Sequence, residues 1–135
     1  MIIGSRDAER AATAANEYSG LAKDAYGSIN GTISGKDNLS VAKESEVLIL
    51  SIPYENIDTT CSQLLSEISD QCVVISPIVP MTKTDVGFEC IAIKDNKAFS
   101  HQTVEKHMKD KTKLVSALDG FVDIDESFTY PRYYK

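Results

Sequence analysis

Runs of apolar residues alternate with stretches of helical periodicity along most of this chain. The apolar runs predict strands at 1–4, 46–52, 72–75 and 113–117, with a shorter strand at 32–34. Between them, apolar side chains recur every three or four positions, which predicts helices at 8–26, 38–43, 57–68 and 101–110. The first helix ends between 18 and 26, with Gly20 as a possible stop. Strands that alternate with helices are typical of an α/β fold with a mainly parallel sheet and flanking helices.

Three segments either depart from this alternation or allow a more specific prediction. The strand at 46–52 has a continuous apolar centre, so we expect it to be buried on both faces, as in a parallel sheet. Residues 81–90 are expected to form a loop, and 91–93 a short strand or extended segment. From 119 to 135 the chain is acidic and aromatic-rich without clear periodicity, so we expect a loosely ordered tail there.

Composition and charge narrow the class of protein. The chain has 135 residues, of which 42% are hydrophobic and 25% are charged, as in an ordinary globular domain. Its net charge of -6 argues against a nucleic-acid partner, which usually requires a basic face. No apolar run has membrane-spanning length, and the start lacks the regions of a signal peptide. These features predict a cytoplasmic protein without a membrane partner.

The cysteines and histidines do not predict a redox or metal centre. Cys61, Cys72 and Cys90 include no Cys-x-x-Cys pair, and their odd number favours free thiols that pack as small buried apolar side chains. His101 and His107 are six positions apart, so on one helix they point in different directions. We therefore expect no metal ligands among them.

The first ten residues form the most informative segment. A short strand ends in Gly4-Ser5-Arg6 and leads directly into a helix that Asp7 can cap, with Arg10 one turn further on. In dinucleotide-binding α/β folds, an Arg at this position accommodates the 2′-phosphate of NADP, whereas an acidic residue selects NAD. A hydroxyl and two guanidinium groups suit a phosphate, which Arg binds by charge-assisted hydrogen bonds. The competing interpretation is a solvated helix face.

Two further strand ends carry prolines. Residues 51–54 follow the central strand, and 76–80 follow the next strand along the chain. Ligands of open α/β sheets bind beyond the carboxyl ends of the strands, so Pro53 and Pro77 could stiffen loops that face a flat cofactor. Alternatively, both prolines simply end their strands, a role that proline often has.

Taken together, the segments resemble one enzyme family, the NADPH-dependent reductases of the deazaflavin coenzyme F420, which occur in archaea and some bacteria. The resemblance covers residues 1–118, and its segments are IIGSRDAERA (2–11), LSIPYE (50–55), VVISPIVP (73–80), GF (87–88) and VSAL (115–118). It implies an incomplete Rossmann-like, doubly wound sheet over 1–118, followed by a divergent tail over 119–135. The resemblance also implies that the family's Gly-rich strand-turn and helical C-terminal domain are missing, and we expect the chain to be a fragment.

The resemblance further implies the chemistry and the site. Family members transfer a hydride between NADP(H) and coenzyme F420, and the cofactors supply this chemistry. By position, Ser5, Arg6 and Arg10 would hold the 2′-phosphate of NADP. The remaining cofactor-binding positions would be Ile52, Pro53, Tyr54, Ile57, Ser76, Pro77, Val79 and Pro80. The family also implies a homodimer.

Two alternatives stay open at this point. One is another NADP-dependent reductase of related fold, such as an imine or 2-hydroxyacid reductase, against which the segment 76–80 argues. The other is a non-catalytic remnant or nucleotide-binding module, which the expected lack of a Gly-rich turn favours.

Overall fold

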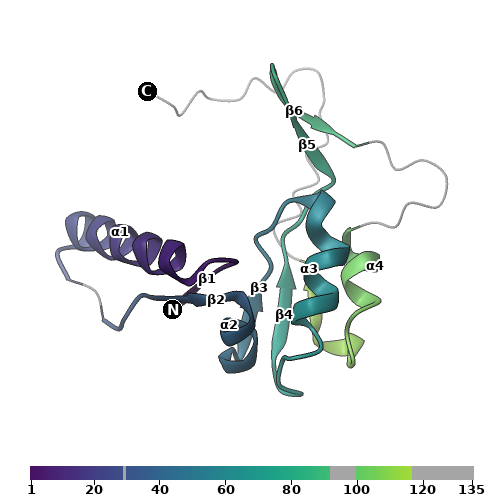
Figure 1. Ribbon diagram of the computed structural model, residues 1–135, viewed down its shortest axis with the longest axis horizontal. Helices are drawn as coiled ribbons and strands as arrows, with labels where there is room; N and C mark the ends of the chain where they lie inside the picture. The colour runs from purple at the N-terminus through teal and green to yellow at the C-terminus, as the bar shows by residue number, and fades with distance from the viewer. Residues whose placement is uncertain (29, 92–99, 117–135) are drawn as a thin grey trace.

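The computed structural model describes residues 1–28, 30–91 and 100–116, and it contains three small sheets (Figure 1). The first pairs β1 (Ile2–Ser5) with β2 (Ser34–Asp37) in parallel. The second is also parallel, in the order β3 (Val47–Ile49), β4 (Val73–Ser76), β7 (Leu114–Ser116). The third is an antiparallel hairpin of β5 (Met81–Thr84) and β6 (Gly87–Cys90). The α/β class with parallel sheets is thus confirmed.

Helices follow most of the strands. They are α1 (Ala8–Tyr26), α2 (Asn38–Glu44), the 3₁₀ turn η1 (Tyr54–Asn56), α3 (Ile57–Leu64), α4 (Ser100–Glu105) and the 3₁₀ turn η2 (Lys111–Lys113). Figure 1 shows α3 and α4 on one side of the sheet that contains β3 and β4, and α1 beside β1 and β2. The short helix α2 contacts β1, β2 and α3, so it joins the two parallel sheets.

Helix α1 begins at its predicted cap and lies very close to β2. The Asp7 carboxylate accepts hydrogen bonds from the backbone N–H groups of Glu9 and Arg10 at 2.9 and 3.0 Å. The helix continues through Gly20 and ends at Gly27, whose φ of 74° favours glycine. Its buried side chains are alanines, and a Cβ added at Gly35 of β2 would overlap the backbone of Ala11. Small residues on both elements therefore set this close approach.

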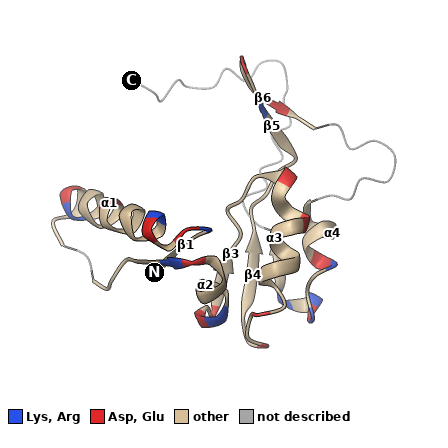
Figure 2. Cartoon of the chain, in the orientation of Figure 1, with Lys and Arg blue, Asp and Glu red and all other residues tan. Residues whose placement is uncertain are grey.

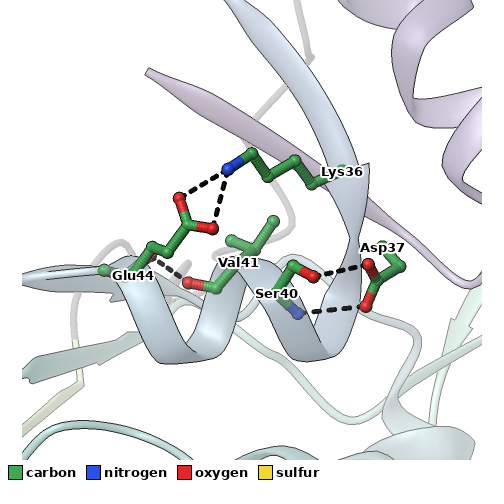
Figure 3. Close-up of polar contacts among 6 residues, drawn as sticks. Lys36, Asp37, Ser40, Val41 and Glu44 are labelled. Carbon is green, nitrogen blue, oxygen red and sulfur yellow. Dashed lines mark hydrogen bonds and ion pairs between the residues drawn. The ribbon is translucent and has the colours of Figure 1, made fainter.

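Helix α2 is fixed at both of its ends by polar contacts (Figure 3). Asp37 ends β2 and caps α2, accepting hydrogen bonds from the Ser40 hydroxyl at 2.6 Å and the Ser40 backbone N–H at 3.0 Å. These two bonds hold the pKa of the Asp37 carboxyl below its usual value. At the other end, the Lys36 ammonium lies 2.6 Å from the Glu44 carboxylate.

The core lies between α3, α4 and one face of the β3-β4-β7 sheet. That face contributes buried Leu48, Val74 and Leu114. The largest fully buried side chains of the helical layer and its flanks include Ile57, Leu65, Val104 and Cys61. Strands β3 and β4 carry no charged residue along their length (Figure 2).

The opposite face of the same sheet is open in the part of the chain that the structure describes. Val47 is 55% exposed and Ile49 is 60% exposed, and Val115 of β7 is 44% exposed. The prediction that strand 46–52 is buried on both faces is therefore wrong. An apolar run shows that a strand can be buried on both faces, but each face is buried only if another element packs against it.

Several predicted bounds are corrected. The loop expected at 81–90 is the β5-β6 hairpin, and the strand expected at 32–34 lies at Ser34–Asp37. The strand expected at 46–52 is limited to Val47–Ile49. The helix expected at 101–110 is the shorter α4 at Ser100–Glu105. Expectations for 92–93 and for the tail at 119–135 lie outside the described residues.

All three cysteines are free, as predicted, but only Cys61 and Cys72 are buried. Cys90 is exposed on the hairpin, which corrects the prediction that it packs inside. Burial raises the pKa of the Cys61 thiol to about 11, with the nearby Asp58 carboxylate adding to the effect. Burial also raises the pKa of Cys72. Across the described ranges, no helix combines the length and apolar character that crossing a membrane requires.

Candidate functional site

The segment after β1 presents two cationic side chains at the start of α1. Ser5 is half-buried, and its hydroxyl accepts a hydrogen bond from the Asp7 backbone N–H at 3.3 Å. Arg6 and Arg10 are both exposed, and neither has an ion pair within the described ranges. Acidic side chains surround Arg10, which lies in a shallow hollow that Glu9 and Glu17 also line. Arg6 lies outside that hollow.

A larger cavity opens beyond the carboxyl ends of β3 and β4. Its volume is about 660 Å³, within the ordinary range for small-molecule sites. It is lined by Leu50, Ser51, Ile52, Pro53, Tyr54, Glu55, Pro77, Ile78, Val79, Met81, Lys83 and Phe88. Five of the positions predicted from the sequence, Ile52, Pro53, Tyr54, Pro77 and Val79, thus share one cavity.

Parallel pairing brings these two strand ends together. Ile49 of β3 is in register with Ile75 of β4, and the Leu50 N–H donates to the Ile75 carbonyl at 2.9 Å. Pro77 follows β4 directly, whereas Leu50, Ser51 and Ile52 separate β3 from Pro53. Pro53 starts the η1 turn, because its carbonyl accepts the Asn56 N–H at 3.0 Å. The cavity therefore forms where the ladder stops, which is the usual ligand position in open α/β sheets.

Three predicted positions lie elsewhere. Ile57 is fully buried in the core at the first turn of α3. Ser76 is also buried, and its hydroxyl has no hydrogen-bond partner among the described residues. The Pro80 carbonyl accepts the Ile91 N–H at 2.7 Å, at the base of the hairpin. None of these side chains lines the cavity.

The hairpin contributes lining residues that the sequence did not reveal. Met81, Lys83 and Phe88 face the cavity although 81–90 is predicted as a loop. The hairpin turns at Asp85 and Val86, and the sequence signal available for it was Gly87 just after this pair, because Asp-Val is not one of the dipeptides that mark a two-residue turn. It is weak because the flanking strands carry little apolar alternation.

The two histidines have different partners at different places. His101 of α4 lies 2.6 Å from the Ser116 hydroxyl of β7, measured from its Nδ1 atom. The His107 Nε2 atom lies 2.9 Å from a carboxylate oxygen of Asp58, in the first turn of α3. The described part of the chain contains no group of three or more potential metal ligands.

Parallel strand pairs joined by crossover helices, α1 between β1 and β2 and α3 between β3 and β4, together with an apolar cavity at the strand ends, are typical of a Rossmann-like α/β domain. The family model described as "NADP oxidoreductase coenzyme F420-dependent" matches residues 1–80, more than half of the chain. The chain therefore belongs to this family, and the resemblance seen in the sequence is confirmed.

A curated relative supports the same assignment. The F420-dependent NADP reductase of Methanocaldococcus jannaschii is 40% identical over 120 residues, which cover 89% of this chain and 52% of the relative. The chain thus spans about half the length of the relative that it matches.

Proposed function

We propose that this chain binds NADP(H) and coenzyme F420 and supports hydride transfer between them. The observation that carries the proposal is the cavity at the ends of β3 and β4, which gathers five of the positions expected for cofactor binding. Family membership supports the choice of cofactors.

For the 2′-phosphate of NADP(H), we propose Ser5, Arg6 and Arg10. Ser5 and Arg6 are consecutive and Arg10 follows one helical turn later, and a hydroxyl with two guanidinium groups that form no ion pair in the described ranges suits a phosphate dianion. The acidic neighbours of Arg10 lower the local positive potential, so Arg6 is expected to contribute the larger share.

For the reacting rings, we propose the cavity walls formed by Ile52, Pro53, Tyr54, Pro77 and Val79. Apolar side chains and rigid proline rings suit planar ligands, and they exclude water from the face that they cover. The cofactors themselves supply the hydride donor and acceptor, while the protein orients them.

Three residues would act behind this surface. Ile57 anchors the first turn of α3 under η1, and the buried hydroxyl of Ser76 lies at the end of β4. Pro80 holds the base of the hairpin through its carbonyl. We propose that they position the cavity walls without contacting the cofactors.

The first test compares NADPH and NADH binding to Arg6→Ala. A charge-assisted hydrogen bond contributes about 1.5–3 kcal/mol, so NADPH should bind roughly tenfold to over a hundredfold more weakly. NADH lacks the 2′-phosphate and should be almost unaffected. Lys23→Ala is a matched control, because it removes an exposed cation from the last turn of the same helix. Equal weakening of both nucleotides would refute the phosphate role.

A second test follows turnover. The full chain is mixed with NADPH and coenzyme F420, and the absorbance of both is recorded over time. Coupled loss of the two signals supports hydride transfer. A non-catalytic nucleotide-binding module is the alternative that the structure favours next, because β1 and β3 both end their described sheets on an open edge. Binding of both cofactors without any turnover would favour that module.

Selectivity for coenzyme F420 separates this proposal from another NADP-dependent reductase of related fold. Such an enzyme would oxidise NADPH with an imine or 2-oxoacid and not with F420. The predicted homodimer and cytoplasmic location remain predictions, and light scattering of the purified chain tests the first of them.

A further inference from the structure

The β5-β6 hairpin has one face that belongs to the cavity. In an antiparallel pair, directly opposed residues lie on the same face, and alternate residues along each strand do so as well. Lys83 is opposed to Phe88, and Met81 lies two positions before Lys83. These three residues are the ones that line the cavity, whereas Thr82 and its opposed partner Glu89 lie on the other face.

The base of the hairpin is tied to the segment after β4. The Met81 N–H donates to the Val79 carbonyl at 2.9 Å, and the Ile91 N–H donates to the Pro80 carbonyl. At the other end, the Thr84 hydroxyl donates to the Gly87 carbonyl at 3.3 Å across the turn. The hairpin is therefore held over the strand ends, and its β5 strand also contacts η1.

The chemistry of the cavity-facing side is unusual for an exposed surface. Phe88 is 68% exposed, although a bare aromatic ring in water is unfavourable. Lys83 of β5 is the one cationic side chain among the described residues that line the cavity. The rest of the lining is mainly apolar, with Glu55 as its one acidic residue.

We propose that this hairpin face, Met81, Lys83 and Phe88, recognises the second cofactor. Phe88 packs against the planar ring system, and Lys83 pairs with an anionic group that the same ligand carries. The inference rests on the proposed function. NADP(H) is assigned to the end of β1 through its 2′-phosphate, so the side of the cavity formed after β4 is left for the second ring. Aromatic packing and one cation together select a flat anionic ligand.

The test measures dissociation constants for coenzyme F420 and for NADPH by fluorescence titration of the full chain. Phe88→Ala should weaken F420 binding about tenfold, because ring packing is lost. Phe88→Tyr keeps the ring and should bind within about twofold of wild type. Lys83→Gln should weaken F420 binding roughly threefold to tenfold at low salt, and the difference should shrink as salt is added. NADPH binding should change little in all three variants.

Controls on the opposite face separate recognition from stability. Thr82→Val and Glu89→Gln alter the same two strands without touching the cavity and should leave F420 binding unchanged. If F420 binds the wild type but the cavity-face and control variants behave alike, the role of the hairpin is refuted while the proposed function stands. If the wild type binds NADPH but not F420, the proposed function and the proposed role of the hairpin are both refuted as far as they concern F420. The recognition role is supported if the cavity-face variants weaken F420 binding more than the control variants do, while all of them have the same melting temperature.

Discussion

The contact between α1 and β2 allows a sharp test of the packing in this fold. A Cβ added at Gly35 would lie closer to the backbone of Ala11 than 3.0 Å, a separation below which Cβ contacts essentially never fall. The atoms that it meets are backbone atoms, which cannot rotate away. In Gly35→Ala, helix α1 must therefore move off the sheet by on the order of 1 Å.

The expected loss of stability follows from what that movement uncovers. Ala11 and Ala15 are 1% and 2% exposed, so partial separation uncovers two methyl groups at about 0.8 kcal/mol each. Residual strain adds roughly 1–3 kcal/mol. We expect Gly35→Ala to lower the free energy of unfolding by roughly 3–5 kcal/mol, and the melting temperature by roughly 10–20 °C.

A second glycine in α1 is the matched control. Gly20 lies within the helix, and an added Cβ would meet nothing within 4 Å. Gly20→Ala should therefore raise stability by up to about 1 kcal/mol, because alanine favours the helix. Both variants are compared with wild type by circular dichroism during thermal and urea unfolding. If Gly35→Ala melts at or above the temperature of Gly20→Ala, the close helix–sheet contact is wrong.

Further predictions concern charge, the open sheet face and the thiols. Folding lowers the pKa of the Asp37 carboxyl, so this group stabilises the chain above its unfolded pKa, and the stabilisation is lost as the pH falls through the folded pKa. Asp37→Asn should therefore destabilise the chain at pH 7 and much less at about pH 2–3. Urea unfolding at the two pH values measures the difference. The double variant of Val47→Thr with Ile49→Thr should reduce self-association in size-exclusion chromatography, because both side chains face solvent on a sheet edge strand; unchanged elution would contradict this. A thiol reagent should modify exposed Cys90 in the native chain, whereas Cys61 should react only after unfolding, and mass spectrometry of peptides will identify the modified residue.

The amino-acid sequence by itself determined the local structure wherever a feature depends on near neighbours. The Asp7 cap follows from an acceptor placed just before an alanine-rich helix. The apolar runs that contain Leu48 and Val74 predict parallel strands, because a buried strand needs apolar residues along its length. The segments 51–54 and 76–80 were also indicated, since parallel strands place their carboxyl ends at one edge of a sheet, and the family resemblance then supplied the five positions that line the cavity.

Only the tertiary structure decided which faces are covered and which side chains meet. An apolar run is the same whether its second face is packed or open, so the exposure of Val47 could not be read from it. The hairpin carries no buried stripe, because it packs over a cavity instead of a core, and its sequence pattern is correspondingly weak. Lys83 reaches the cavity through pairing register, and Gly35 is required by a helix that begins far from it in the sequence. Such contacts depend on distances between elements, and local periodicity does not encode those distances.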